Sequence, residues 1–171
     1  ESSVRRAVRV VMGSPALFSI GLMNSLYEGA LYLFVFMWTP VLEQRAAGGA
    51  HVPHGVVFSL FMCCKMAGSQ VFLIAAPLGP ASILTGVFAC SVVVLLVPLM
   101  SESYLAALLA FCAFELGLGL YWPAIASLRA QWVPDEVRSS VASVFRVPLN
   151  VLVVGCLLGA GYASTNTMLL L

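Results

Sequence analysis

Four ionisable side chains lie inside long apolar runs: two acids, Glu28 and Glu115, and two bases, Lys65 and Arg146. The run LYEGALYLFVFMWTP, residues 26–40, contains Glu28 as its only charged residue. An ionised group at the middle of a bilayer costs about 2.5–3.5 kcal/mol on insertion scales. If these runs cross a membrane, the four groups must face the protein interior or water. There they could pair with one another or attract a charged solute.

Polar neighbours accompany these groups at helical spacing. Asn24, Glu28 and Tyr32 follow one another at four-residue intervals, which places them on one face of a helix. We therefore add Asn24 and Tyr32 to the candidate site. Other side chains share a face with Lys65 or with Glu115: Phe61 and Gly68 with the lysine, and Phe111 and Trp122 with the glutamate.

Two interpretations of the four charges are open. They could form ion pairs that only lock a helical bundle, or they could line a polar pathway for a solute. Replacing a buried ion pair by apolar residues is often neutral or stabilising. Structural pairing alone therefore gives little reason to retain two acids and two bases, and we favour the pathway.

Composition defines the class of protein that holds these residues. The chain has 171 residues, of which 61% are hydrophobic and 9% charged, and its mean hydropathy is +1.03. A soluble domain is typically about a quarter charged. The apolar residues form continuous runs rather than an alternating pattern, which predicts an all-α, multi-pass integral membrane protein with the lipid bilayer as a partner. The net charge of +1 predicts no bulk attraction to nucleic acid.

The apolar runs predict five complete spans and part of a sixth, at residues 15–42, 55–77, 81–100, 104–128, 141–162 and from 168, with a loop at 164–167. Arginines outside the spans favour one side of the membrane, which we assign to the cytoplasm. That side carries Arg5, Arg6, Arg9, Arg129 and Arg138, against Arg45 on the other. Because the chain begins at Glu1 and ends in MLLL, we expect an excerpt of a longer protein.

The cysteines and histidines predict no metal centre. We also expect no cofactor and no enzymatic activity. All five cysteines fall inside predicted spans, where they are expected to pack as small, soft side chains. No Cys/His spacing typical of a metal site occurs. His51 and His54 flank Pro53 in the outer loop and are expected to be solvated.

The order of the charges predicts an internal repeat. Spans one and four each hold an acid, spans two and five each hold a base, and span three holds neither. Two three-helix units in tandem would cross the membrane in opposite directions, which is the inverted repeat common in secondary transporters. Gly117 and Gly119, near Glu115, are expected to serve helix packing rather than a hinge.

Three segments of the chain resemble a known family: residues 25–43, 117–141 and 143–152. SLYEGALYLFVFMWTPVLE, GLGLYWPAIASLRAQWVPDEVRSSV and SVFRVPLNVL are similar to the C-terminal half of the molybdate-anion transporters, in the major facilitator superfamily. The resemblance implies a twelve-helix bundle in two halves. This chain would supply helices seven to eleven and the start of helix twelve, and the N-terminal half would be missing.

The resemblance also implies a function, secondary active uptake of molybdate by alternating access, and it favours the plasma membrane. Lys65 and Arg146 would attract the dianion. Glu28 and Glu115 would repel it unless they partner the bases between transport events or carry a coupled proton. Two alternatives stay open: a non-transporting helical subunit or scaffold within a larger membrane assembly, and a relative that carries a sugar or an organic anion.

Overall fold

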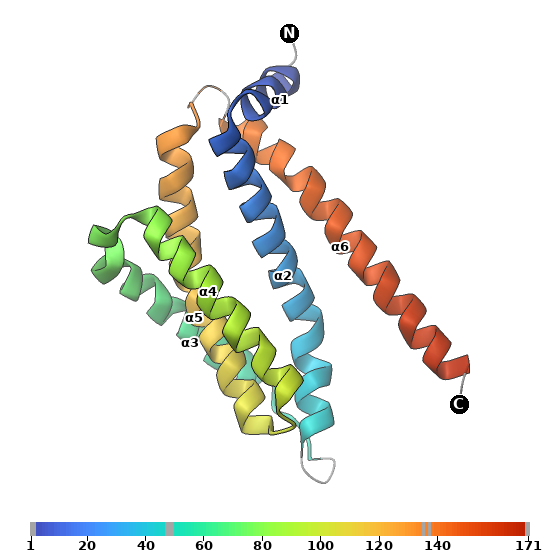
Figure 1. Ribbon diagram of the computed structural model, residues 1–171. Coiled ribbons are helices and arrows are strands. Elements are labelled where there is room, and N and C mark those ends of the chain that lie inside the picture. Colours follow the sequence, from blue (N-terminus) through green and yellow to red (C-terminus); the bar gives the residue numbers. More distant parts are fainter. Residues whose placement is uncertain (1–2, 47–49, 135, 137, 170–171) are drawn as a thin grey trace. The chain divides into compact units, whose positions relative to one another are not determined.

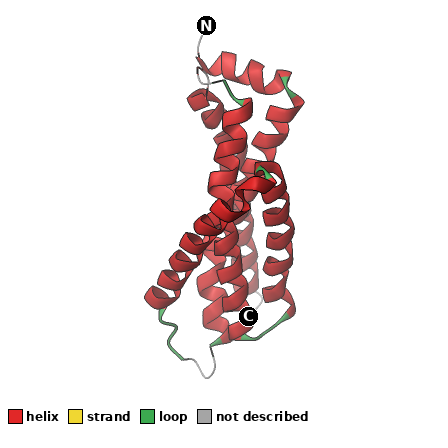
Figure 2. Cartoon of the chain, turned by 90° about the vertical axis from the view of Figure 1, so that its left-hand side faces the viewer, coloured by secondary structure: helices red, strands yellow, loops and turns green. Residues whose placement is uncertain are grey.

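The computed structural model describes residues 3–46, 50–134, 136 and 138–169, with the side chains of residues 3, 4, 157 and 160–169 left aside. Figure 2 shows helices joined by short loops, and the described residues contain no strand. The elements, labelled in Figure 1, are α1 (Ser3–Gly13), α2 (Pro15–Arg45), α3 (His54–Ala75), the 3-10 helix η2 (Ala76–Leu78), α4 (Pro80–Met100), α5 (Tyr104–Trp132) and α6 (Arg138–Leu169).

Five of these helices are long and apolar enough to cross a membrane: α2, α3 with η2, α4, α5 and, over Arg138–Cys156, α6. The predicted all-α membrane class is therefore confirmed. Two helices end later than predicted, since α2 continues to Arg45 and α5 to Trp132. Gln and Arg form helices well, and long basic side chains can extend from a span end to the membrane surface.

The very short link between the second and third spans is a single glycine turn. Gly79 has φ +81°, a conformation that side-chain-bearing residues rarely adopt, and Pro80 follows as the first residue of α4. The amide of Gly79 donates a hydrogen bond of 3.1 Å to the carbonyl of Ala76, which closes η2. This turn lets α4 start directly after η2.

The end of α6 differs from the sequence prediction. The predicted loop at 164–167 lies within a continuous helix that runs to Leu169, so no separate span begins at 168 in the described residues. The segment ASTNTML contains neither Gly nor Pro. Ser and Thr hydroxyls inside a helix can bond to the carbonyl four residues earlier, so polar residues alone did not require a loop.

Helix α1 was not predicted. It is amphipathic: Arg5, Arg6 and Arg9 are exposed, while Ala7 and Val11 are buried. Helix α1 packs against α6, and Figure 1 shows it beside the start of that helix. Arg6 also donates a hydrogen bond of 2.8 Å to a carboxylate of the α5–α6 link, Glu136. Exposed ion pairs contribute about 0–1 kcal/mol. The apolar contact of α1 with α6 therefore contributes more to its docking than the ion pair does.

The chain divides into two compact units. Unit 1 comprises residues 1–35 and 132–171, and unit 2 comprises residues 36–131. Unit 1 therefore holds α1, the first part of α2, and α6. Unit 2 holds the rest of α2, followed by α3, η2, α4 and α5.

Small residues bring α2 and α6 together in unit 1. Gly21, Ser25 and Gly29 repeat at four-residue intervals on α2. A Cβ at Gly21 would collide with the ring of Phe145, and one at Gly29 would lie 2.7 Å from Leu152. The hydroxyl of Ser25 lies 2.8 Å from the carbonyls of both Phe145 and Gly21, so it can donate to either. Small residues on one face permit this close approach of helices.

The docking of α1 should depend on its apolar face. Ala7→Asp puts a carboxylate into the fully buried contact and should weaken docking by about 1–3 kcal/mol. Trypsin should then cut faster after Arg9 in membrane vesicles. Val8→Asp is the matched control, because Val8 is already 43% exposed. Equal cleavage rates in the two variants would contradict the packing described for α1.

Candidate functional site

Lys65 of α3 and Glu115 of α5 form an ion pair inside unit 2. The lysine Nζ lies 3.9 Å from Oε2 of Glu115, and the side chains are 32% and 5% exposed, respectively. Oε2 of Glu115 is buried and has no hydrogen-bond partner among the described residues. The lysine charge is thus the main compensation for this carboxylate. The contact realises one of the acid–base pairings that the sequence left open.

The ion pair belongs to a longer seam between α3 and α5. Phe61 meets Phe111 edge to face, with ring centroids 6.5 Å apart. One turn on, Cys64 and Cys112 are neighbours across the same seam. The partners rise in number together along both helices, so α3 and α5 run parallel. The predicted common face of Phe61, Lys65 and Gly68 is confirmed, since all three meet α5. Trp122, which spacing placed on the face of Glu115, is 36% exposed instead of packed in the seam.

Two glycines allow the helices to come this close. A Cβ at Gly68 would overlap the carbonyl oxygen of Leu116, and one at Gly119 would overlap the carbonyl oxygen of Lys65 and lie 2.8 Å from Cα of Gly68. The hydroxyl of Ser69 adds a hydrogen bond of 3.3 Å to the carbonyl of Gly119. The packing role predicted for Gly119 is confirmed. Without this backbone contact, Lys65 would stand farther from Glu115.

Glu28 has a different partner, in unit 1. Its Oε1 accepts a hydrogen bond of 2.8 Å from Nδ2 of Asn24, one turn earlier on α2. Asn24 is 4% exposed and Glu28 is half-buried. The predicted shared face of Asn24 and Glu28 is thus present, but within unit 1 Glu28 forms no ion pair with Arg146. Tyr32, the third member of that face, is 47% exposed and carries no described contact with them.

Arg146 lies on α6 with an exposed side chain. Among the described residues it forms neither an ion pair nor a hydrogen bond. The structure thus joins two pairs of the six candidates, Lys65 with Glu115 and Asn24 with Glu28, and leaves Arg146 and Tyr32 outside them.

The end of unit 2 at the α2–α3 link carries contacts that the sequence did not predict. His54, expected to be solvated, begins α3: its Nε2 lies 3.0 Å from Oε1 of Glu43, and its ring packs edge-on to Trp38 at 5.8 Å. Trp38 in turn meets Phe61 at 5.4 Å. The cause is that α2 extends to Arg45, which brings Glu43 to the start of α3. His51, by contrast, is exposed as predicted.

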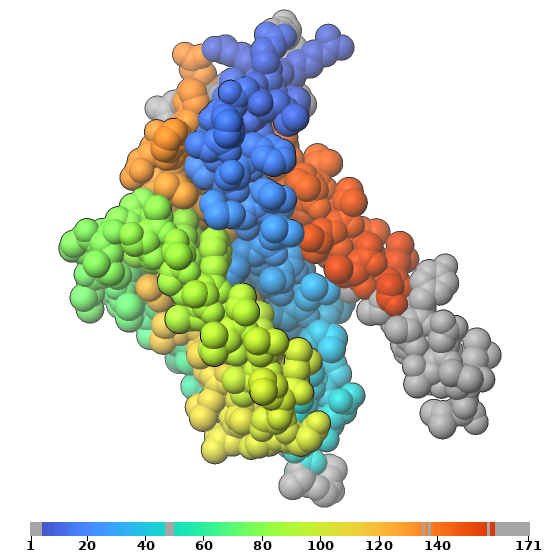
Figure 3. Space-filling model, viewed as in Figure 1, coloured from blue at the N-terminus to red at the C-terminus, as the bar shows by residue number. Residues whose placement is uncertain are grey.

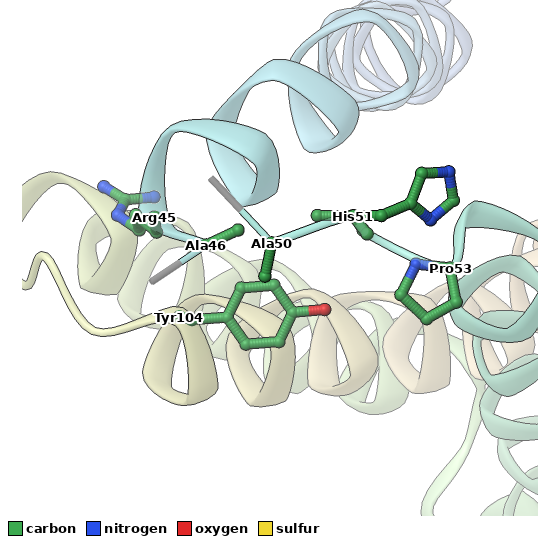
Figure 4. A pocket seen from close by; sticks show the side chains of 7 residues that line it. Arg45, Ala46, Ala50, His51, Pro53 and Tyr104 are labelled. Atoms are coloured by element: carbon green, nitrogen blue, oxygen red, sulfur yellow. The ribbon is translucent and has the colours of Figure 1, made fainter. Parts of the chain in front are cut away.

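A pocket of about 240 Å³ lies at the same end, lined by Arg45, Ala46, Ala50, His51, Val52, Pro53 and Tyr104. In Figure 4 the Tyr104 ring lies under Ala50, while the side chains of Arg45 and His51 point to opposite ends. A guanidinium N–H of Arg45 donates to the carbonyl of Pro98, and its Nε is 3.7 Å from Glu102. None of the six candidate residues lines this pocket, and its polar groups do not converge.

Comparison with known proteins assigns the family. Residues 1–122 match a family of the major facilitator superfamily described as sugar transporters with 12 transmembrane segments. The chain belongs to this family. The membrane-spanning helices of the structure agree with that assignment. No solved structure matches the chain significantly.

Several curated relatives bear the name molybdate-anion transporter. The protein from Takifugu rubripes is 34% identical over 163 residues, covering 85% of this chain and 31% of the relative. Those from Danio rerio and Xenopus tropicalis are each 34% identical as well, covering 94% and 88% of this chain and 36% and 35% of the relatives. The chain spans about a third of the length of these relatives.

The glycine contact should determine the stability of the α3–α5 seam. Gly68→Ala forces the two backbones apart and should cost roughly 1–3 kcal/mol, as overpacking does. The melting temperature of the purified protein in detergent measures this loss. Gly86→Ala on α4 is the control, because a Cβ there meets nothing within 4 Å. Equal melting temperatures for both variants would show that the close contact does not stabilise the protein.

Removal of one charge of the Lys65–Glu115 pair should lower the free energy of unfolding more than removal of both charges. Breaking a buried pair costs about 3–5 kcal/mol. Since Lys65 is 32% exposed, we expect a smaller loss, about 2 kcal/mol, for Lys65→Met. The double variant Lys65→Met/Glu115→Leu should recover most of that loss, because it removes the uncompensated carboxylate. A double-mutant cycle of unfolding free energies tests this, and additive losses would mean that the pair is not coupled.

Proposed function

We propose that the protein is a secondary transporter for a tetrahedral oxyanion, with molybdate as the first candidate. The observation that carries this proposal is the similarity of most of the chain to proteins named molybdate-anion transporters. An exposed arginine within a membrane span, Arg146, supports it. A guanidinium offers several fixed N–H donors to anion oxygens, and its charge is retained at any physiological pH. No catalytic step is part of the proposed function.

The two bases have different roles in the proposal. Lys65 already compensates Glu115, so its charge is not available to a solute while that pair is closed. Arg146 has no such counter-charge among the described residues, and it is the better first contact for a dianion. Lys65 becomes a second contact in a state in which its pair with Glu115 opens. Entry of the anion would favour that state because it replaces the carboxylate as the partner of the ammonium group.

Glu28 has the converse role. Its hydrogen bond to Asn24 holds the carboxylate in place while Arg146 is unpaired. In a second state of the empty transporter Glu28 would pair with a base, and the incoming anion would displace it. Two states of similar energy are what a transport cycle requires.

Alternating access requires a second bundle that moves against this one. We propose that this chain belongs to the second six-helix half of a twelve-helix protein and supplies its helices seven to eleven. The length of the curated relatives and the description of the family support this arrangement. Uptake of an external oxyanion would place the protein in the plasma membrane, with its arginine-rich side in the cytoplasm.

A second candidate substrate follows from the family description, which names sugars. A neutral sugar would be bound through hydrogen bonds and would give Arg146 no ionic role. A non-transporting helical subunit is the remaining alternative, and it predicts no uptake of either solute.

Uptake of radiolabelled molybdate by cells that express the complete gene tests the proposal. We expect saturable uptake that excess sulfate or tungstate reduces and excess glucose does not. Arg146→Leu should lower uptake at least tenfold at equal surface expression, because the main ionic contact of the anion is lost. Glu28→Gln keeps an acceptor for Asn24, so it should insert normally while uptake falls or its pH profile changes.

The competing solutes and the variants distinguish the three candidate functions: oxyanion transporter, sugar transporter and non-transporting subunit. Inhibition by glucose together with normal uptake in Arg146→Leu would favour the sugar transporter. Absence of any uptake above that of untransfected cells would favour the non-transporting subunit. Normal uptake and an unchanged pH profile in Glu28→Gln would leave Glu28 a structural residue.

A further inference from the structure

Helix α6 presents three different faces along its membrane span. One face is packed within the protein and consists of Val141, Phe145 and Leu149, which are at most 4% exposed. A second face is apolar and exposed, and it consists of Val147, Val151, Val154 and Leu158. The third face is polar and exposed, and it consists of Ser139, Ser143, Arg146 and Asn150. We call this third face the α6 polar face.

The α6 polar face is narrow and continuous. At 3.6 residues per turn its four positions fall within roughly 60° of one another. In Figure 3 the described part of α6 is coloured orange to red. The apolar exposed face next to it is suited to lipid. A face with a guanidinium and a carboxamide is not, because polar groups in hydrocarbon are costly.

Two side chains of this face have unused hydrogen-bond donors. Neither Arg146 nor Asn150 has a hydrogen bond or an ion pair among the described residues. Ser143 differs, because its hydroxyl donates a hydrogen bond of 3.1 Å to the carbonyl of Ser139. Side chains three or four residues apart on a helix have their Cβ atoms about 5–6 Å apart. Arg146 and Asn150, four residues apart, can therefore meet around one small ion, whereas Ser143 lies seven residues, about 10 Å, from Asn150.

We propose that Asn150 is an oxyanion-binding residue that acts together with Arg146. The ligand class is a tetrahedral dianion whose oxygens only accept hydrogen bonds. Arg146 donates two parallel N–H bonds to a pair of oxygens, and the amide of Asn150 donates to a third. Ser143 is not a ligand in this proposal, because its hydroxyl is bonded to Ser139 and it lies about two turns from Asn150. This inference rests on the proposed function and extends it to a residue that spacing and charge had not marked.

The amide of Asn150 is neutral. It therefore adds hydrogen-bond donors to the site without adding a charge. A carboxylate at this position would have the same shape and only acceptors, and it would repel the dianion beside Arg146. Asn150→Asp is therefore a sharper probe than a truncation, because it changes charge with almost no change in volume.

The test measures molybdate uptake in cells expressing the complete gene, with KM and maximal rate normalised to surface protein. Asn150→Leu should raise KM about tenfold, corresponding to about 1.4 kcal/mol, and leave the maximal rate within about twofold. Asn150→Asp should raise KM further. Ser143→Ala should leave KM nearly unchanged, because Ser143 is not a ligand. Ser59→Ala is the matched control, because Ser59 is also exposed on a membrane helix and donates to the carbonyl four residues earlier, at Gly55.

The outcomes distinguish this inference from the function on which it rests. If the unmodified protein takes up molybdate and both Asn150 variants keep its KM, the role of Asn150 is wrong and the proposed function stands. A fall in surface protein with unchanged KM would assign the α6 polar face to contact with another helix and would also overturn the inference. If the unmodified protein takes up no molybdate, the proposed function and the anion site both fail.

Discussion

The cost of a charge in an apolar medium is the constraint on which this structure depends. Glu115 is almost completely buried, and one of its oxygens has no hydrogen bond among the described residues, so the nearby lysine must compensate it. That compensation requires α3 and α5 to approach closely, which only glycines allow at Gly68 and Gly119. Sterics and electrostatics are thus coupled in one seam: the small residues bring the backbones together, and the ion pair makes the buried acid tolerable.

The second helix pair solves the same packing problem with similar means. In unit 1 α2 and α6 also run parallel and also meet through small residues, with Ser25 bonded to a carbonyl of the neighbouring helix, as Ser69 is in unit 2. In the inverted repeat predicted from the sequence, span one (α2) corresponds to span four (α5), and span two (α3) corresponds to span five (α6). The α2–α6 pair of one unit therefore corresponds to the α5–α3 pair of the other. Each pair then joins an acid-bearing span to a base-bearing span.

The two pairs differ in electrostatics. In the α3–α5 pair the acid and the base are in contact. In the α2–α6 pair the acid is bonded to Asn24 and the base stays exposed. Arg146 has no counter-charge among the described residues, and in the function proposed above the solute itself would supply that charge.

The sequence by itself determined the membrane class, the five spans and the order of acids and bases along them, because hydropathy and span length are local properties of the chain. It also identified Lys65 and Glu115, but four pairings of two acids with two bases were possible. Only the tertiary structure selected one, since the choice depends on backbone contact between residues about fifty positions apart. For the same reason it decided the partner of His54 and the docking of α1. The sequence analysis did not identify the polar face around Asn150. Only burial distinguished this face from the packed face of the same helix.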